Sequence, residues 1–87
     1  MKILRTDEIP HITEGYISIN GTPLYAGMRM NKLHIWFSHA LEAEDAAVFN
    51  LAYVETNEDF PAGASYLFTT VGEDSYVYHV VKLYITN

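Results

Sequence analysis

The sequence contains no cysteine and few basic residues. Without thiols the chain can form neither a disulfide framework nor a thiolate centre, so we expect a reducing cytosol as its location. Only five Lys and Arg oppose eleven Asp and Glu, which gives a formal net charge of −6. Nucleic-acid backbones are bound by clustered Lys and Arg. The five bases are scattered along the sequence, so we expect no direct nucleic-acid partner.

Long hydrophobic runs are also missing. No apolar run approaches the roughly 18 residues that a membrane-spanning helix requires, so no membrane segment is predicted. The apolar start of the chain is interrupted at once by Arg5, Asp7 and Glu8, and no secretory signal peptide is predicted. A length of 87 residues leaves room for one domain, which we expect to span residues 1–87.

The apolar residues that are present recur mainly with a period of two, which is typical of β-strands. Only residues 41–47 have a helix-forming composition, and this stretch is short enough to form one helical turn at most. Asn20-Gly21 predicts a tight turn. We therefore predict an all-β fold, a small antiparallel sandwich or barrel of six to seven short strands. The predicted strands are residues 2–9, 16–19, 24–30, 32–40, 48–56, 66–71 and 76–86.

Residue patterns typical of catalysis or of metal binding are missing. In a regular strand His34 and His39 point to opposite faces, and His11 and His79 have no neighbour at ligand spacing. No serine lies in a Gly-x-Ser-x-Gly motif, and no glycine-rich loop leads into a helix. We therefore expect a protein that is not an enzyme, with no catalytic residues, no metal site and no cofactor.

The acidic residues fall mostly between the predicted strands, where two interpretations are open. Acidic loops keep a protein soluble. Alternatively, an acidic rim meets a basic surface of a partner, such as a host protein that binds nucleic acid. The candidate partner-binding carboxylates are Glu42, Glu44, Asp45, Glu58 and Asp59.

The last predicted strand has two largely apolar faces, whereas a strand with one solvated side has a polar face. Either the monomer covers both faces or another chain covers one of them, and so small a chain has little material for both. Because tyrosine is enriched at interfaces, we expect a homo-oligomer or a bound partner here. The candidate contact residues are Tyr76, Tyr78 and Tyr84, together with Trp36, whereas Val81 and Leu83 are expected in the core.

The order of short motifs resembles a family of very small, mostly uncharacterised proteins of tailed phages and prophages. The matching elements are Lys2-Ile3-Leu4, Ile35-Trp36, the segment from Pro61 through Gly63-Ala64 to Tyr66 and Thr69, and Val77-Tyr78-His79-Val80. The resemblance implies a compact all-β domain of phage origin, with no catalytic residues to carry over. Small phage proteins of this kind often act by binding a host protein.

Three functions are compatible with these observations. The first hypothesis is a phage-encoded, non-enzymatic protein that binds and inhibits or redirects a host protein, plausibly an anti-CRISPR or anti-restriction factor in the host cytoplasm. The second is a small capsid-decorating or assembly protein that binds a phage structural protein in the virion. The third is a ligand-binding barrel whose interior lies around Trp36, Tyr66 and His79.

Overall fold

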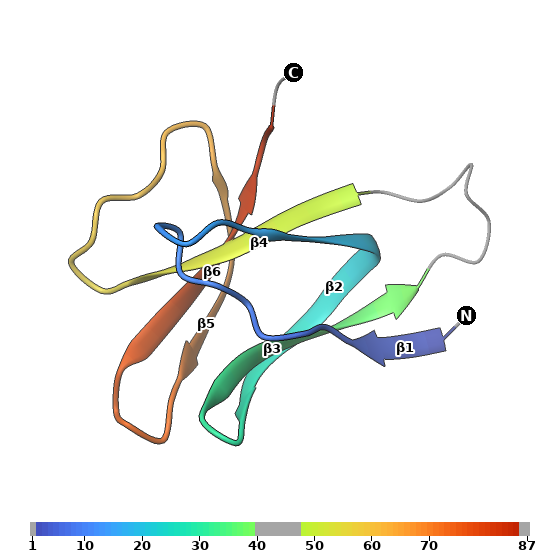
Figure 1. Ribbon diagram of the computed structural model, residues 1–87, viewed down its shortest axis with the longest axis horizontal. Helices are drawn as coiled ribbons and strands as arrows, with labels where there is room; N and C mark the ends of the chain where they lie inside the picture. The colour runs from blue at the N-terminus through green and yellow to red at the C-terminus, as the bar shows by residue number, and fades with distance from the viewer. Residues whose placement is uncertain (1, 40–47, 86–87) are drawn as a thin grey trace.

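A computed structural model describes residues 2–39 and 48–85, and these form an all-β fold (Figure 1). Six antiparallel strands build one sheet in the order β1-β3-β2-β4-β6-β5, which curls into a half-barrel. The described ranges contain no helix, and the predicted fold class is confirmed. The strands are β1 (Lys2–Arg5), β2 (Ile17–Arg29), β3 (Lys32–His39), β4 (Val48–Glu55), β5 (Ser65–Val71) and β6 (Val77–Leu83).

Strand β2 bends and thereby joins the two halves of the sheet. Its first part, Ile17 to Asn20, pairs with β4, and its second part, from Gly21 onward, pairs with β3. Gly21 has a φ of +147°, and a Cβ atom there would overlap the backbone carbonyl of Ser38. The predicted turn at Asn20-Gly21 is therefore wrong, because both residues continue the strand through a bend that only glycine permits.

The β2–β3 hairpin turns at Met30 and Asn31, which both have positive φ, and Asn57 and Ser75 adopt positive φ in the next turns. An irregularity interrupts the register of β2 with β3 between Pro23 and Tyr25. The predicted helical turn at 41–47 lies outside the described residues.

The hydrophobic core fills the concave side of the curled sheet. Alternation in β3 directs Leu33, Ile35 and Phe37 to this side, and Leu51 of β4 and Val80 of β6 meet them there. These side chains are at most 8% exposed. The remaining buried members of the cluster are Ile9, Ile19 and Ala26.

The segment of residues 6–12 crosses from one half of the sheet to the other (Figure 1, blue). The N–H of Ile9 donates to a β3 carbonyl (2.8 Å), and its side chain is buried in the core. Farther along, Tyr53 of β4 donates its N–H to the carbonyl of Pro10 (3.0 Å) and accepts from the N–H of Ile12 (2.9 Å). The segment thus connects β3 to β4, two strands that are not neighbours in the sheet.

Strand β6 is covered on both faces at its centre. Val80 on the core side and Val81 on the opposite side are both 0% exposed. Opposite Val81 lie the small Ala52 of β4 and the large Tyr66 of β5. The expectation that so small a monomer could not cover both faces is therefore wrong at this position, because the monomer alone buries both Val80 and Val81.

Candidate functional site

His11 and Tyr53 form the centre of a polar region between segment 6–12 and the end of β4. The two backbone hydrogen bonds of Tyr53 fix His11, which lies between their partners Pro10 and Ile12. The imidazole then meets the phenol ring of Tyr53 edge-on, with ring centroids 5.2 Å apart. The position of His11 in this loop is therefore fixed by backbone hydrogen bonds like those of a strand.

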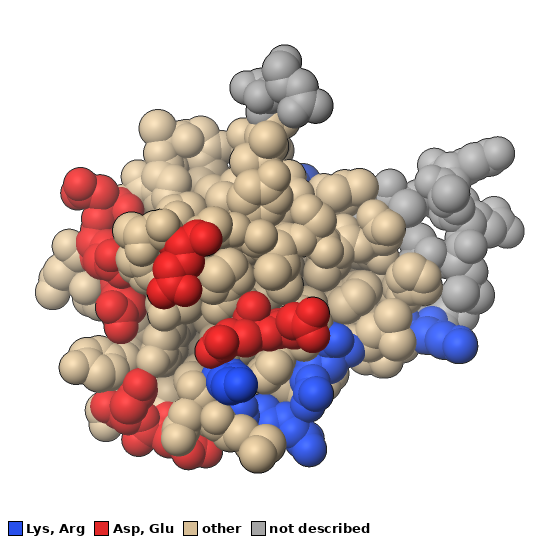
Figure 2. Space-filling view, in the orientation of Figure 1, with Lys and Arg blue, Asp and Glu red and all other residues tan. Residues whose placement is uncertain are grey.

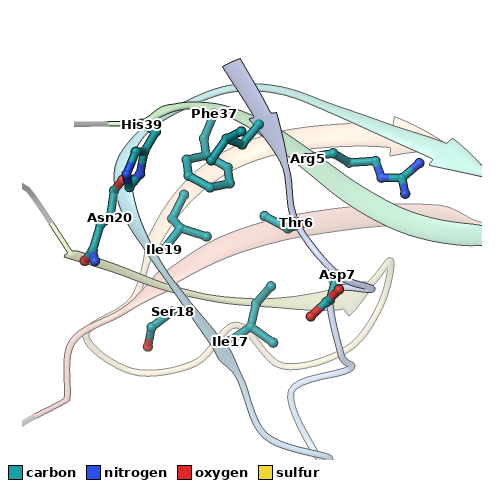
Figure 3. A pocket seen from close by; sticks show the side chains of 10 residues that line it. Arg5, Thr6, Asp7, Ile17, Ser18, Ile19, Asn20, Phe37 and His39 are labelled. Carbon is teal, nitrogen blue, oxygen red and sulfur yellow. The ribbon is translucent and has the colours of Figure 1, made fainter. Parts of the chain in front are cut away.

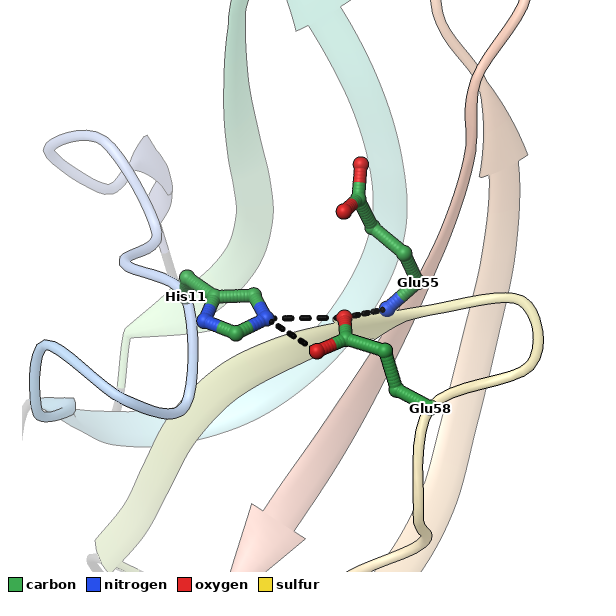
Figure 4. Close-up of side chains that lie close together, drawn as sticks. All are labelled: His11, Glu55 and Glu58. Carbon is green, nitrogen blue, oxygen red and sulfur yellow. Dashed lines mark hydrogen bonds and ion pairs between the residues drawn. The ribbon is translucent and has the colours of Figure 1, made fainter.

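His11 is paired with Glu58, which lies in the connection between β4 and β5 (Figure 4). Its Nε2–H donates to the Glu58 carboxylate, with both oxygens at 2.8 Å. Its Nδ1 accepts from the hydroxyl (2.7 Å) and the N–H (3.2 Å) of Thr13. Glu58 Oε1 also accepts from the backbone N–H of Glu55 (2.6 Å). Both partners are therefore held in fixed orientations.

Two groups in this region, Glu58 and Tyr53, have shifted pKa values with different causes. The backbone N–H of Glu55 and the His11 side chain lower the pKa of Glu58 below its ordinary value of 4.5. The pKa of Tyr53 is raised, first by burial and then by four carboxylates, those of Glu55, Glu14, Glu8 and Glu58. We call these four residues, together with the neighbouring exposed Asp59, the acidic surface.

Three side chains of this region have the donor types of a metal site. His11, Glu55 and Glu58 each offer one ligand atom, and these atoms lie within 4.8 Å of one another. Imidazole nitrogen and carboxylate oxygen suit a divalent cation. The hydrogen bond between His11 and Glu58 already satisfies two of these three ligand groups. Sequence spacing could not reveal the group, because its members come from segments that only the closed fold brings together.

The predicted acidic residues are divided by the structure. Glu58 and Asp59 belong to the acidic surface, whereas Glu42, Glu44 and Asp45 lie outside the described residues. Sequence reasoning had not singled out Glu8, Glu14 or Glu55 as partner-binding residues. Only the three-dimensional fold shows that these residues belong together, because they flank two separate segments that hydrogen-bond to each other.

The predicted tyrosine contacts occupy different environments. Tyr76 and Tyr84 are 61% and 59% exposed, and the Tyr84 hydroxyl hydrogen-bonds Ser65 (3.0 Å). Tyr78 instead packs against the core, edge-on to Tyr53 at 5.0 Å, and its hydroxyl donates to Asp74 (2.7 Å). That hydrogen bond, with burial, raises the pKa of Tyr78 to about 12. Tyr76 and Tyr84 are thus available to a partner, and Tyr78 also supports the monomer.

Trp36 lies on the convex side of the sheet, opposite the core-facing side chains of β3. Register places it between Arg5 of β1 and Tyr25 of β2. The rings of Tyr25 and Trp36 are 5.8 Å apart, and those of His34 and Trp36 6.3 Å. Two residues farther along the same face, Gly27 pairs with His34, and beyond them Arg29 pairs with Lys32. We call this surface of β1, β3 and β2 the basic face.

Three of the five Lys and Arg residues belong to the basic face. Bases that are scattered along the sequence therefore lie close together in the fold. In Figure 2 the basic side chains lie over the lower middle and the right of the view, beside one acidic group at the centre, whereas the other acidic side chains lie to the left and lower left. Arg5, Arg29 and Lys32 line an open hollow of about 390 Å³ together with Met30 and His34.

A second hollow of about 400 Å³ opens between β1 and the first part of β2 (Figure 3). Leu4, Ile17, Ile19 and Phe37 supply apolar walls, and His39 lies at its rim, where its Nδ1 bonds the carbonyl of Asn20 (3.2 Å). Arg5 and Asp7 also line the hollow, but their opposite charges do not form a set suited to one charged ligand.

The three residues of the ligand-barrel hypothesis do not meet in one interior. Tyr66 and His79 are joined through the hydroxyl of Thr69, at 2.7 Å and 3.0 Å, on the face of the sheet opposite the core. The other nitrogen of His79 bonds the Thr56 hydroxyl (2.9 Å). Trp36 belongs to the basic face, in the other half of the sheet. These three residues therefore do not form the single interior that the ligand-barrel hypothesis assumed.

His34 and His39 lie on opposite faces of β3, as the spacing predicted. The ring nitrogen Nδ1 of His34 bonds the carbonyl of Thr6 (2.9 Å), whereas His39 bonds Asn20 on the core side. No helix in residues 2–39 and 48–85 has the length and apolar character needed to cross a membrane. Comparison with protein-family models, with curated proteins and with solved structures finds no match for this chain.

Proposed function

We propose that this chain is a non-enzymatic binding protein that contacts a basic surface of a partner protein through its acidic surface. The observation that carries the proposal is that four carboxylates from separate segments lie close enough to Tyr53 to raise its pKa, and that one of them, Glu58, bonds His11. Like charges held together oppose folding. A partner rich in Lys and Arg relieves that repulsion, accelerates association and makes it selective.

Exposed aromatic side chains flank these carboxylates and favour a protein partner over a simple ion. Phe60 follows Asp59 directly and is 51% exposed. Tyr16 comes two residues after Glu14 and is 46% exposed. Aromatic side chains inside a polar rim are typical of interface hot spots, where truncation of one side chain often costs about 2 kcal/mol or more. Glu58 and Asp59 would form part of that rim.

The resemblance of the sequence to small phage proteins supports a bacterial host protein as the partner. Host proteins that bind nucleic acid carry basic grooves, and an acidic surface is complementary to such a groove. The proposed outcome is inhibition or redirection of the host protein in the host cytoplasm, as in an anti-restriction or anti-CRISPR factor.

The test compares two variants with the same change of charge. Asp59→Lys reverses a charge within the acidic surface, and Glu73→Lys reverses one in the β5–β6 turn, where the side chain is also exposed. Wild-type and variant proteins are immobilised, proteins from a bacterial lysate are captured, and each captured protein is purified and its affinity measured by calorimetry.

We expect Asp59→Lys to weaken binding at least about tenfold, with steep salt dependence, and Glu73→Lys to bind like wild type. Equal affinities for both variants would exclude the acidic surface as the contact. If no protein binds the wild-type chain saturably, the proposed function is wrong.

A further inference from the structure

The basic face carries charge that the proposed function does not use. The sequence has no Asp or Glu between Glu14 and Glu42, a stretch that contains Arg29 and Lys32. Pairing of β1 with β3 then adds Arg5 to the same face. A chain with a net charge of −6 therefore folds so that three of its five Lys and Arg residues line one hollow.

Among the described residues these cations form no close ion pair. No described carboxylate oxygen lies within 4.0 Å of the side-chain nitrogens of Arg5, Arg29 or Lys32, although acidic side chains lie beside basic ones in Figure 2. His34 adds a ring that is 8% exposed and whose Nδ1 is held by the carbonyl of Thr6. The hollow thus offers two guanidinium groups, one ammonium group and a fixed imidazole.

An aromatic pair adjoins the hollow. Tyr25 is 62% exposed, although its ring contacts Trp36. Gly27 makes this arrangement possible, because a Cβ atom there would lie 2.9 Å from Cε2 of Tyr25 and 3.4 Å from Cζ3 of Trp36. The rings therefore lie over the glycine and leave an aromatic surface next to Arg5, which faces Trp36 across the β1–β3 pair.

We propose that the basic face binds a nucleoside monophosphate, with the phosphate in the hollow and the base against Tyr25 and Trp36. Arginine forks and a lysine ammonium are the usual ligands of a phosphate dianion. Aromatic rings stack on bases of any sequence. A volume of about 390 Å³ suits a ligand of this size. The surrounding acidic residues repel a long polyanion but have less effect on a ligand confined to this face.

Trp36 is the one tryptophan of the chain, so its fluorescence reports directly on this face. The experiment titrates the protein with AMP, with adenosine and with inorganic phosphate, and repeats each titration by calorimetry. We expect a saturable change with AMP and affinity at least about tenfold weaker for either half of the molecule. No heat and no fluorescence change with AMP would overturn the proposal.

Variants distinguish a built site from general charge attraction. Arg29→Gln and Lys32→Gln should each weaken AMP binding about fivefold or more. Lys82→Gln removes the same charge from β6, where the ammonium lies over the rings of Phe49 and Tyr84, and should leave AMP affinity unchanged. An equal loss in Lys82→Gln would show attraction without a site.

Two further measurements test the identity of the ligand. Tyr25→Ala should weaken AMP binding and leave the affinity for inorganic phosphate unchanged, because it removes one of the two stacking rings. Unchanged AMP affinity in Tyr25→Ala would overturn the role of the aromatic pair. An octanucleotide that binds far more tightly than AMP would make single-stranded nucleic acid the ligand and overturn the proposal of a mononucleotide. These results are independent of the protein partner at the acidic surface.

Discussion

The acidic surface and the basic face differ in how their charged side chains are bonded within the fold. In the acidic surface, Glu58 bonds His11 and the N–H of Glu55, so part of the negative charge is stabilised within the fold. On the basic face, Arg29 and Lys32 have no carboxylate partner among the described residues. Charge that the fold stabilises should affect folding when it is removed, whereas charge without an internal partner should affect binding.

The largest change in the free energy of unfolding is expected at the bend of β2, the strand that joins the two halves of the sheet. Gly21→Ala should destabilise the protein by about 3 kcal/mol, because the new methyl group overlaps the carbonyl of Ser38 and φ is +147°. Gly63→Ala is the control, since Gly63 has a φ of +78° and open space around it, so about 1 kcal/mol of strain is expected. Urea unfolding followed by Trp36 fluorescence measures both, and equal losses would contradict the role of the bend.

The comparison is tested by replacing one polar side chain in each region, His11 beside the acidic surface and Lys32 on the basic face. His11→Ala should cost about 1–2 kcal/mol, because it removes bonds to Glu58 and Thr13 and the contact with Tyr53. Lys32→Gln should change the free energy of unfolding by less than about 0.5 kcal/mol. Urea titrations at neutral pH measure both values. A larger loss in Lys32→Gln than in His11→Ala would reverse our assignment of the two regions.

A smaller effect is expected at Tyr78, whose hydroxyl connects the core to the β5–β6 turn. Tyr78→Phe should cost about 1 kcal/mol through loss of the hydrogen bond to Asp74. Because the pKa of Tyr78 is raised from 10.0 to about 12, its stabilising contribution is complete below pH 10 and is lost as pH rises toward 12. The difference between wild type and Tyr78→Phe should therefore shrink over that pH range. A difference that stays constant would show that the phenol does not titrate as described.

The smallest effect concerns Glu58 in acid. Its pKa is lowered from 4.5, so its stabilising contribution is present above pH 4.5 and is lost as the pH falls through the lower value. Glu58→Gln should be less stable than wild type at neutral pH and should approach it in acid. Asp59→Asn is the matched control and should follow the wild-type profile. Thermal unfolding from pH 7 to pH 3 measures all three proteins, and parallel profiles for wild type and Glu58→Gln would contradict the ion pair.

Most of the strands could be predicted because alternation is a local property. The alternation of Leu33, Ile35 and Phe37 predicts a strand with one buried face, and these three side chains are buried in the structure. Asn20-Gly21 was misread because the same dipeptide serves a turn and a bend. The choice between them depends on β3 and β4, which pair with the two parts of β2 and are distant in sequence.

The candidate sites were less accessible to sequence reasoning than the fold. The sequence identifies Glu58 as a turn residue but does not identify His11 as its partner. Ligand spacing compares only residues that are close in sequence, and these two are 47 residues apart. The three cations of the basic face were counted as scattered for the same reason, since β1 and the β2–β3 hairpin meet only through pairing with β3. Charge segregation was nevertheless visible in the sequence as the acid-free stretch between Glu14 and Glu42.

The path of segment 6–12 has a consequence for biosynthesis. This segment leaves the ribosome early, yet its backbone partners lie in β3 and at Tyr53 in β4. Ile9 therefore has no completed core to enter until β3 and β4 have been synthesised, and contacts so distant in sequence form slowly. We expect the nascent chain to expose this apolar segment until Tyr53 emerges, so the acidic surface can form only after β4 has left the ribosome.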